Sequence, residues 1–599
     1  MKKMKEEWYK HPTNLVDLFE DTVKKFPNRP WIGEQNAEGE YEWTSYKEAS
    51  DRIDHLRAGL AEIGIGKDDS VGLIIDNSLE WAIIAFATYG LGARLVPMYQ
   101  KELEKIWRYI VEDSNVKVLF VADKGILEKT KHYKDEIETL ENIYIIRGEK
   151  EGKNTMSALE ELGSENSISS VKPHWSDIAC LIYTSGTTGD PKGVLLSHGN
   201  FTTNVRAAHA GFPDTNKEDV SFGILPWAHS FGQTGELYHE TYFGGSVGLM
   251  KSVDSLTTDI VKVKPTILVA VPRIFNKVYA GIHNKLEEEG KGHLLEMAKQ
   301  AAAKKRNGEK RGLKERLITW IVFKKIRKLF GGRLRYAITG SAVMNPEIAQ
   351  FFIDVGIPTF DCYGLTETTP ALTMNTPTEN KLGTVGKAIK DVTVVIDKSR
   401  VGEDSEDGEI ICFGPNVMQG YYNKPNKTAE VIVEDEDLGR GVRTGDRGRL
   451  DENGFLYITG RFKEEYKLEN GKYVHPASIE GELKLVPYIA NAFVYGDGKP
   501  YNVGIIFPDF AFLEKYAIDN DIDFNENKAL INNQKVQEFL GKEAIKQLQG
   551  NFGGYEIPKK WLFIDEDFTV ENGMLTQTMK LKRRNVLKNY GDQIKTLYN

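Results

Sequence analysis

Short apolar runs alternate with longer amphipathic stretches through much of the chain. Between Asn14 and Val96, helical stretches are interrupted by runs such as VGLII (Val71–Ile75), and similar runs recur at Val118–Val121 and Ile143–Ile146. Buried strands separated by helices are typical of βα units that build a largely parallel sheet. The pattern therefore predicts an α/β fold for the first part of the chain.

A second group of βα units follows a polar segment, Lys153–Lys172, which we expect to be a surface connection. Apolar runs at Ile178–Tyr183 and Val194–Leu196 predict two strands with a loop between them. Asn200 is a candidate N-cap for the helix after the second strand. The same alternation continues over residues 222–271 and 336–359.

The pattern changes near Gly386 to short strands separated by turns, as in DGEIICFGP (Asp407–Pro415) and DENGFLYITG (Asp451–Gly460). A βαβ-like tail follows. We therefore predict an N-terminal domain over residues 1–460, made of layered α/β subdomains plus a small β-rich part. The tail, residues 461–599, is predicted to be a small α+β C-terminal domain.

Composition narrows the class of protein. The 599 residues are 40% hydrophobic, with a mean hydropathy of −0.41, as in ordinary soluble enzymes. Cys180, Cys362 and Cys412 lie far apart without CxxC spacing, which favours a reducing compartment and no structural zinc. Met1–Asn14 lacks the apolar core of a signal peptide, and the apolar run Trp81–Ala93 is shorter than the ~20 residues that span a bilayer. A cytoplasmic protein that is not integral to the membrane is expected.

Charge adds one local feature. The net charge of −9 argues against nucleic acid as a partner. Residues 297–335 invert this balance, because fourteen Lys and Arg stand against only Glu309 and Glu315, an excess of +12. This basic segment needs an explanation of its own.

The strongest local signal is YTSGTTGDPKG, Tyr183–Gly193. Hydroxyls and closely spaced glycines can surround a polyphosphate with donors, and Lys192 can neutralise charge there. The loop is not a Walker A motif, since Lys192 is followed by Gly193 and an apolar run. On composition alone, a Ser/Thr/Gly stretch of this kind is more often an ordinary solvated loop.

The full pattern of this loop resembles the adenylate-forming superfamily of acyl-CoA synthetases, firefly-type luciferases and peptide-synthetase adenylation domains. The resemblance continues in order along almost the whole chain. Its further motifs are LPWAHSFGQ (Leu225–Gln233), ITGSAVMNP (Ile338–Pro346), DCYGLTETTP (Asp361–Pro370), RTGDRG (Arg443–Gly448), ITGRFKEEYKLENGKYVHP (Ile458–Pro476) and LTQTMKLKR (Leu575–Arg583). So many ordered matches exclude the ordinary-loop interpretation.

The resemblance implies a site for ATP and Mg²⁺. Thr184 and Glu367 would hold the metal, Asp446 would accept from the ribose hydroxyls, and Tyr363 would stack on adenine. The other residues implied for nucleotide binding are Ser185, Gly186, Thr187, Thr188, Gly189, Lys192, Gly340, Ser341, Ala342, Gly364 and Thr366. Taken singly, Asp446 also fits a turn residue and Tyr363 a core aromatic.

Four residues are implied as catalytic: Lys580, Lys192, His229 and Glu367. Lys580 matches the near-terminal lysine that approaches the carboxylate and the α-phosphate. The family pattern Ser/Thr-Gly-Lys is replaced here by Thr578-Met579-Lys580, a form similar to long-chain members. His229 would lie between the carboxylate pocket and the thiol channel, although a lone histidine is usually structural.

Similar enzymes swing a mobile C-terminal domain between two half-reactions, adenylation and then thioester formation with coenzyme A. The implied hinge is Lys463, and Arg461 and Lys463 would also contact phosphate or ribose. Lys580 would face the site in the first step. The loop Lys467–Val474, in which Gly471 allows close approach, would replace it in the second.

The stretches at Phe413–Glu430 and Val486–Asp509 resemble long-chain acyl-CoA synthetases. The predicted function is therefore a long-chain fatty acid–CoA ligase that releases AMP and pyrophosphate. One alternative is a fatty acyl-AMP ligase that loads an acyl carrier protein. Another is a catalytically inactive lipid-binding relative. Joint retention of four residues argues against it: Lys192, Glu367, Asp446 and Lys580.

The basic segment, residues 297–335, is a candidate for peripheral contact with an anionic membrane at its inner face. Apolar residues at near-helical spacing alternate there with Lys324, Lys325, Arg327 and Lys328, as in helices that lie on membranes. The alternative is a helix that faces the core and has a solvated cationic side. The apolar residues are Leu313, Leu317, Trp320, Ile321, Ile326, Leu329 and Phe330.

Overall fold

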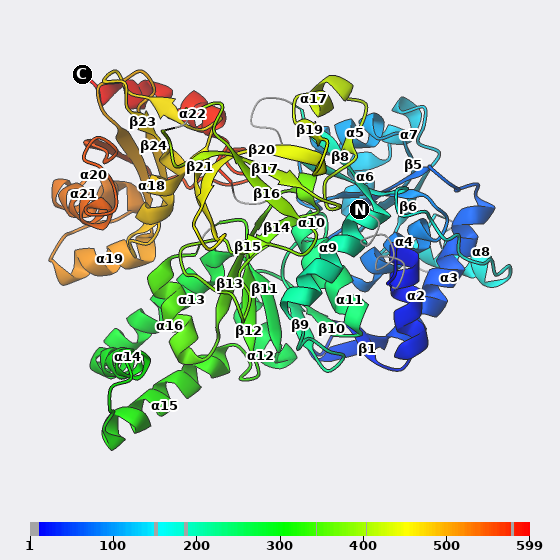
Figure 1. Cartoon of the computed structure of the whole chain (residues 1–599), viewed down its shortest axis with the longest axis horizontal. Helices are drawn as coiled ribbons and strands as arrows, with labels where there is room; N and C mark the ends of the chain where they lie inside the picture. Colours follow the sequence, from blue (N-terminus) through cyan, green and yellow to red (C-terminus); the bar gives the residue numbers. More distant parts are fainter. Residues whose placement is uncertain are drawn as a thin grey trace.

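The structure is a computed structural model that describes residues 11–148, 152, 154–184, 190–342, 344–402, 404–576 and 580–599. Figure 1 shows a large body of sheets covered by helices, with a smaller group of strands and helices beside it at the C-terminal end. Mixed sheets layered with helices confirm the predicted α/β class.

A seven-stranded sheet collects the first βα units, and five of its strands are parallel, as the apolar runs predict. Two antiparallel strands, β8 and β18, extend one edge. In sheet order the strands are β18 (Gly420–Tyr421), β8 (Lys192–Ser197), β7 (Ile178–Thr184), β4 (Arg94–Met98), β3 (Ser70–Ile74), β5 (Val116–Val121) and β6 (Asn142–Ile145). The helices of this part are α2 (Leu15–Lys25), α3 (Tyr46–Glu62), α4 (Leu79–Tyr89), α5 (Glu104–Asp113), α6 (Lys124–Thr130), α7 (Tyr133–Glu136) and α8 (Met156–Ser164).

A nine-stranded sheet takes up the next units, with a parallel centre and antiparallel strands at both edges. In sheet order it contains β15 (Lys387–Ala388), β14 (Ala371–Met374), β13 (Thr359–Gly364), β12 (Tyr336–Thr339), β11 (Ile267–Ala270), β9 (Val220–Gly223), β10 (Ser246–Leu249), β1 (Pro30–Gln35) and β2 (Tyr41–Ser45). Its helices are α9 (His198–Gly211), α10 (Ser230–Gly232), the π-helix η1 (Gln233–Tyr238), α11 (His239–Phe243), α12 (Leu256–Val263), α13 (Pro272–Glu288), α14 (Gly292–Arg306), α15 (Leu313–Leu329), α16 (Pro346–Val355) and the 3-10 turn η2 (Thr366–Thr368).

A five-stranded antiparallel sheet forms the β-rich part that the sequence predicts after Gly386. Its strands are β16 (Thr393–Asp397), β17 (Gly408–Phe413), β20 (Gly439–Leu450), β19 (Ile432–Asp435) and β21 (Leu456–Arg461), and α17 (Pro425–Ala429) precedes β19. Strand β21 runs through Gly460 and ends at Arg461, so that Lys463 lies in the turn that follows.

The chain after this turn forms its own sheets and apolar clusters. A three-stranded sheet, β24-β25-β26, packs with helices around cores that contain Val494 and Ile505, while β22 pairs with β23. The elements are β22 (Tyr466–Lys467), β23 (Tyr473–Val474), α18 (Pro476–Leu483), β24 (Ile489–Tyr495), β25 (Val503–Pro508), α19 (Phe510–Asp519), α20 (Asn527–Asn532), α21 (Gln534–Leu548), β26 (Lys560–Phe563) and α22 (Arg583–Thr596).

Two local predictions are wrong. Asn200 does not cap α9, because Ser197 is the N-cap and Asn200 is the third helical residue of a capping box, with reciprocal bonds of 3.1 and 2.8 Å between them. The polar segment Lys153–Lys172 is not only a connection. It contains α8, which buries Met156 and Leu159 against the core.

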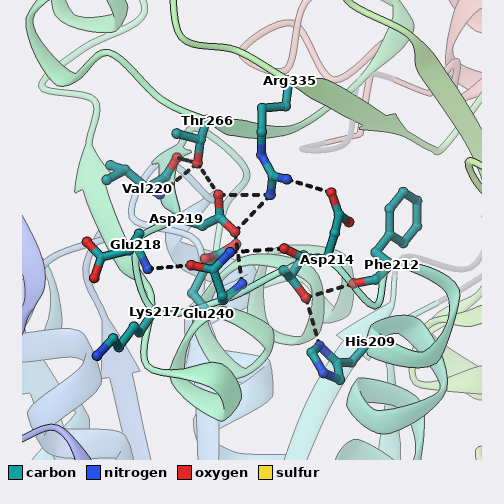
Figure 2. A network of polar contacts seen from close by, with 12 residues as sticks. His209, Phe212, Asp214, Lys217, Glu218, Asp219, Val220, Glu240, Thr266 and Arg335 are labelled. Carbon is teal, nitrogen blue, oxygen red and sulfur yellow. Dashed lines mark hydrogen bonds and ion pairs between the residues drawn. The ribbon is translucent and has the colours of Figure 1, made fainter.

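A polar network closes the amino ends of β9, β11 and β12 (Figure 2). Arg335 pairs with the exposed carboxylate of Asp214 and, at 2.9 Å, with the buried carboxylate of Asp219, which also accepts from Thr266 at 2.7 Å. Glu240 is fully buried beside this network, and burial raises its pKa well above the ordinary value. These contacts fix the sheet at the end opposite to the site described below.

Two further expectations concern membranes and redox chemistry. Among the described residues, every helix is too short or too polar to cross a bilayer. All three cysteines are reduced and buried.

Candidate functional site

The ends of the predicted phosphate loop are held together by strand pairing. Thr184, the last residue of β7, is the register partner of Lys192, the first residue of β8. The sheet therefore fixes both ends of the loop at one edge of the seven-stranded sheet. The loop residues Ser185, Gly186, Thr187, Thr188 and Gly189 lie outside the described residues.

Lys192 and Glu367 both contact Tyr421, one at the ring and the other at the hydroxyl. The Tyr421 hydroxyl donates to Glu367 Oε1 at 2.8 Å, and Lys192 Nζ lies 4.1 Å from the centre of the same ring. Burial lowers the pKa of Lys192, the nearby Glu367 carboxylate opposes this shift, and the positive charge of Lys463 adds to it. A phosphate bound here would relieve the repulsion between the two lysines.

Tyr363, Asp446 and Arg461 form a second polar group. The Tyr363 hydroxyl donates to Asp446 Oδ2 at 2.6 Å, and Arg461 Nε lies 2.6 Å from Asp446 Oδ1. Asp446 and Arg461 are also register partners across β20 and β21, so main-chain pairing supports the ion pair. Asp446 is only 2% exposed, and its carboxylate is therefore fixed in direction.

Lys580 joins this group from the far end of the chain. Desolvation lowers the pKa of its ammonium, and the positive charge of Arg461 lowers it further, whereas the carboxylates of Asp446 and Glu367 raise it. The side chain keeps an exposed surface, so it is solvated on one side and faces charged neighbours on the other. The structure thus brings Lys580 to the same site as Asp446 and Glu367.

His229 lies near Lys580, on the loop before the π-helix. Its Nδ1 accepts from Phe231 N at 3.2 Å, which makes His229 the N-cap of α10. Burial, and then the charge of Lys580, lowers the pKa of His229 to about 4. The imidazole is therefore neutral near pH 7, so it adds no charge to the site and can take part in hydrogen bonds through its ring nitrogens.

Glu236 holds this loop in place from the π-helix η1. Its Oε1 accepts from the backbone amides of Ile224 and Leu225, each at 3.2 Å, and Oε2 accepts from the indole of Trp227 at 3.2 Å. Burial raises the pKa of Glu236 to about 8. A π-helical turn in this position is common at functional sites.

The glycines implied for nucleotide binding have packing reasons. A Cβ at Gly340 would lie 2.9 Å from Phe231, and one at Gly364 would lie 1.8 Å from the Pro370 carbonyl oxygen. Ser341 and Ala342 are exposed, and Ser341 has a φ of 70°. This turn therefore presents its backbone to solvent at the end of β12.

Two more side chains fix the loops around this turn. The buried Asp361 accepts from Thr339 Oγ1 and, at 3.2 Å, from Met344 N, so it holds both sides of the turn, and burial raises its pKa to about 6. Thr366 Oγ1 lies 3.5 Å from Ser230 Oγ, which connects the loop that bears Glu367 to the loop that bears His229.

Lys467 and Gly471 lie apart from this site. They belong to the β22–β23 hairpin, in which Lys467 Nζ lies 5.4 Å from the Tyr473 ring and Gly471 has a φ of 84°. Glu469 N donates to the Lys499 carbonyl, within the C-terminal group of elements. Of the two segments expected to alternate at the site, the structure therefore holds the one with Lys580 there.

The donor set fits Mg²⁺ and a nucleotide. The described residues contain no group of three or more His, Cys, Asp or Glu that could form an all-protein metal cage. Mg²⁺ instead commonly binds one or two protein oxygens and completes its shell with water and substrate phosphates. Thr184 and Glu367 could supply the protein oxygens. Asp446 and Tyr363 offer a fixed carboxylate beside an aromatic ring, as a ribose and a base require.

Sequence reasoning missed three residues at this site: Tyr421, Glu236 and Glu464. Tyr421 lies within QGYYNKP, where nothing distinguishes it from Tyr422 until the fold brings it to Glu367. Glu464 lies 4.0 Å from Arg461. Glu236 lies in the mixed segment GQTGELYHET, which gives no sequence signal that this acid is buried.

Comparison with known proteins agrees with this geometry. Residues 19–422 match the family model described as AMP-binding enzyme. The chain is 31% identical over 624 residues to long-chain-fatty-acid–CoA ligase 5 of Rattus norvegicus, which covers 99% of this chain and 89% of that protein. It is 30% identical over 577 residues to a long-chain-fatty-acid–CoA ligase of Mycobacterium bovis, with 93% of each chain covered.

Solved structures agree on the fold. The adenylation domain of a carboxylate reductase from Mycobacterium chelonae superposes with a TM-score of 0.78 at 22% identity, covering 98% of this chain and 91% of that domain. The adenylation domain of a carboxylic acid reductase from Segniliparus rugosus, solved with AMP, gives a TM-score of 0.77 at 21% identity, covering 98% and 94%. With the family match over residues 19–422, these findings establish that the chain belongs to the AMP-binding enzyme family.

Proposed function

We propose that this protein is a long-chain fatty acid–CoA ligase, an acid–thiol ligase that uses ATP, Mg²⁺ and coenzyme A and releases AMP and pyrophosphate. The observation that supports the proposal is the polar group of Tyr363, Asp446 and Arg461, joined by two contacts of 2.6 Å. Lys580, from the far end of the chain, is close enough to this group for the charges of Asp446 and Glu367 to raise its pKa. The similarity to long-chain-fatty-acid–CoA ligases over nearly the full length supports the acyl substrate and the thiol acceptor.

In the proposed first half-reaction, a fatty acid carboxylate attacks the α-phosphorus of ATP and pyrophosphate leaves. The repulsion between anions is the main barrier to this attack, so cations in fixed positions lower it most. Lys580 would neutralise the carboxylate and the α-phosphate, and Lys192 the departing phosphates. Bound Mg²⁺ would supply further charge neutralisation, held by Glu367 and Thr184.

The remaining residues would bind and orient. Asp446 would accept from the ribose hydroxyls, Tyr363 would stack on adenine, and Gly340 would allow close approach beside it. Arg461 would keep Asp446 in position through their ion pair of 2.6 Å. Neutral His229, beside Lys580, would border the path by which the acyl group and the thiol meet.

We also propose that the chain works as two domains, residues 1–460 and residues 461–599. Separate apolar clusters on the two sides of the Arg461 turn support this division. For the second half-reaction the C-terminal domain would rotate about Lys463. The hairpin with Lys467 and Gly471 would then replace Lys580 at the site and admit the thiol of coenzyme A.

A direct assay tests the proposed function. The full-length protein is supplied with ATP, Mg²⁺ and free fatty acids from short to very long, and AMP release is measured with coenzyme A or with a pantetheinylated acyl carrier protein. We expect release that needs coenzyme A and is greatest for long chains. Release that requires the carrier protein would identify an acyl-AMP ligase instead, and no fatty-acid-dependent ATP–pyrophosphate exchange would identify an inactive lipid binder.

For location, we propose a cytoplasmic protein with peripheral contact to an anionic membrane through the basic segment, residues 297–335. The excess of twelve positive charges in this segment supports the contact. Long-chain fatty acids partition into bilayers, so an enzyme that rests on one would meet its substrate there.

A further inference from the structure

The structure separates the cations of the basic segment into two groups. Five of the fourteen are engaged within the protein, through contacts of Lys299 with Glu296, Lys304 with Glu315, Arg306 with Asp354, Arg327 with the Val355 carbonyl, and Arg335 with Asp219. The described part of the chain offers no ion pair to the other nine. These are Lys305, Lys310, Arg311, Lys314, Arg316, Lys324, Lys325, Lys328 and Arg333.

Helix α15 has two apolar faces, one buried in the core and one exposed to solvent. Val322, Phe323 and Ile326 are buried in the core formed with α14 and α16. A second set faces solvent at spacings of four, seven and eight residues, which places its members on one side of the helix. This outer face consists of Leu313, Leu317, Trp320 and Ile321, which are 85%, 57%, 55% and 40% exposed.

Charge around the outer face has one sign. Lys324 and Lys328 continue the same side of the helix towards its C-terminal end, and Lys324 Nζ lies 4.5 Å from the centre of the Trp320 ring. The only acid of α15, Glu315, is turned away to Lys304, at 2.6 Å, and to the amide of Gly312, at 2.8 Å. Figure 1 shows α14 and α15 at the periphery of the molecule, and the exposed fractions of its side chains show that the outer face is accessible.

We infer that the outer face of α15 is a membrane-docking surface that inserts Leu313, Leu317, Trp320 and Ile321 into the interface of an anionic bilayer. The inference rests on the proposed function, because docking would give a fatty acid ligase access to fatty acid dissolved in the bilayer. Apolar residues with a tryptophan, bordered by lysines, are typical of helices that lie in the headgroup region.

Charge also determines the orientation of the docked protein. Since the whole chain carries −9 and the basic segment +12, the remainder carries −21 and is repelled by an anionic surface. Because the screening length in salt is about 8 Å, the charge nearest the membrane matters most, which favours approach by the α15 side. The nine unpaired cations favour an anionic partner. In a symmetric dimer formed through this face, the cations of two copies would face each other and repel, so we infer anionic lipid and not a second copy of the chain.

Flotation of the full-length protein with vesicles tests the inference. The vesicles are phosphatidylcholine alone, or phosphatidylcholine with phosphatidylglycerol. We expect wild-type protein to float with the anionic vesicles and only weakly with the neutral ones. The variant Leu317→Ser/Trp320→Ser should bind at least tenfold more weakly even at low salt, since it removes the inserting residues.

Charge variants test the contribution of the lysines at the C-terminal end of the outer face. Lys324→Gln/Lys328→Gln should weaken binding to anionic vesicles by about twentyfold or more, at about fivefold for each charge near the surface. The matched control is Lys542→Gln/Lys546→Gln, which removes two exposed lysines with the same spacing from α21. This control should bind like the wild type.

Three outcomes would overturn the inference: wild-type protein that does not float with anionic vesicles, a Leu317→Ser/Trp320→Ser variant that floats as well as wild type, or an outer face that proves to join two copies of the chain. The last would appear in gel filtration as a dimer that this variant dissolves, without vesicle binding. Acyl-CoA formation from a water-soluble medium-chain fatty acid without vesicles is measured in parallel. It should be unchanged in all variants, so loss of docking and failure of the proposed ligase function are distinguishable.

Discussion

The Tyr421 hydroxyl donates a 2.8 Å hydrogen bond to the Glu367 carboxylate, which family resemblance assigns to Mg²⁺. The same ring lies 4.1 Å from Lys192 Nζ, so one tyrosine contacts both the expected metal ligand and the expected phosphate-binding cation. Tyr421 is therefore a positioning residue for the metal-binding side of the site.

Tyr421→Phe should test this role, because it removes the hydroxyl and keeps the ring. We expect kcat/KM for ATP–pyrophosphate exchange to fall about tenfold, as for loss of a hydrogen bond to a charged group. The Mg²⁺ concentration for half-maximal rate should rise. Tyr422→Phe is the control, since the Tyr422 hydroxyl bonds to Asn115 and not to Glu367; equal effects of the two changes would contradict the assignment.

Lys580→Ala should separate the two half-reactions. The charges of Arg461, Asp446 and Glu367 all shift the pKa of the Lys580 ammonium, as expected if it serves adenylation. Fatty-acid-dependent ATP–pyrophosphate exchange should fall by about 10²- to 10³-fold, as for loss of one preorganised charge-stabilising group. Conversion of chemically prepared acyl-AMP to acyl-CoA should remain. Lys588→Ala, an exposed lysine on α22, should change neither rate.

Lys463→Pro should impair the second half-reaction and spare the first, because proline fixes φ at about −65° and would restrict rotation at the proposed hinge. The turn closes without the Lys463 amide, since Phe462 N bonds to the Gly445 carbonyl and Glu464 N to the Arg461 carbonyl. We expect pyrophosphate exchange to persist while acyl-CoA formation falls at least tenfold. Lys463→Ala should lower both activities to a similar extent, since it removes a cation expected to contact phosphate or ribose but leaves the backbone free to rotate. Selective loss of acyl-CoA formation, as in the proline variant, would assign the effect to the side chain and not to the hinge.

Glu236 should make stability depend on pH. Its pKa in the folded protein is raised from 4.5 to about 8, so its contribution is fully present below about pH 4.5 and is lost as pH rises towards about 8. Glu236→Gln removes this titration. In urea unfolding at a series of pH values, the free energy of unfolding of the variant should decline less over this range than that of wild type. The exposed Glu347→Gln should leave the wild-type slope unchanged.

The network in Figure 2 offers a matched pair of stability variants around one arginine. Arg335 contacts Asp219, whose side chain is 4% exposed, and Asp214, whose side chain is 56% exposed. Asp219→Ala should lower the free energy of unfolding by about 1.5–3 kcal/mol, because it removes a buried charged acceptor from Thr266 and from the partly exposed Arg335. Asp214→Ala should cost at most about 1 kcal/mol. Similar losses in urea unfolding would show that burial does not control this network.

Much of the fold could be predicted because its strands are short apolar runs, which can be located from the local sequence alone. The runs at Ile178–Tyr183 and Val194–Leu196 coincide closely with β7 and β8. Asn200 was misassigned because Ser197 and Asn200 are both suitable cap residues, and only the backbone angles decide between them. The segment that contains α8 was missed because one short apolar side among polar residues gives a weak periodic signal.

The site was accessible to sequence reasoning only where a pattern was long enough to recognise. Tyr421 escaped because a tyrosine carries no charge and gains its role from a partner 54 positions away. The two faces of α15 were not separable either. Leu317 and Ile326 look alike in the sequence, and only the packing of α14 and α16 buries the second and leaves the first in solvent.

The burial of all three cysteines has a practical consequence. Burial raises the pKa of Cys362 and Cys412 to about 12, so neither thiol forms an appreciable thiolate at neutral pH. Maleimide dyes should therefore not react with the native protein. Cysteines introduced at the exposed positions Glu436 and Glu469 would accept such dyes selectively, and energy transfer between them would follow the rotation about Lys463 during a single turnover.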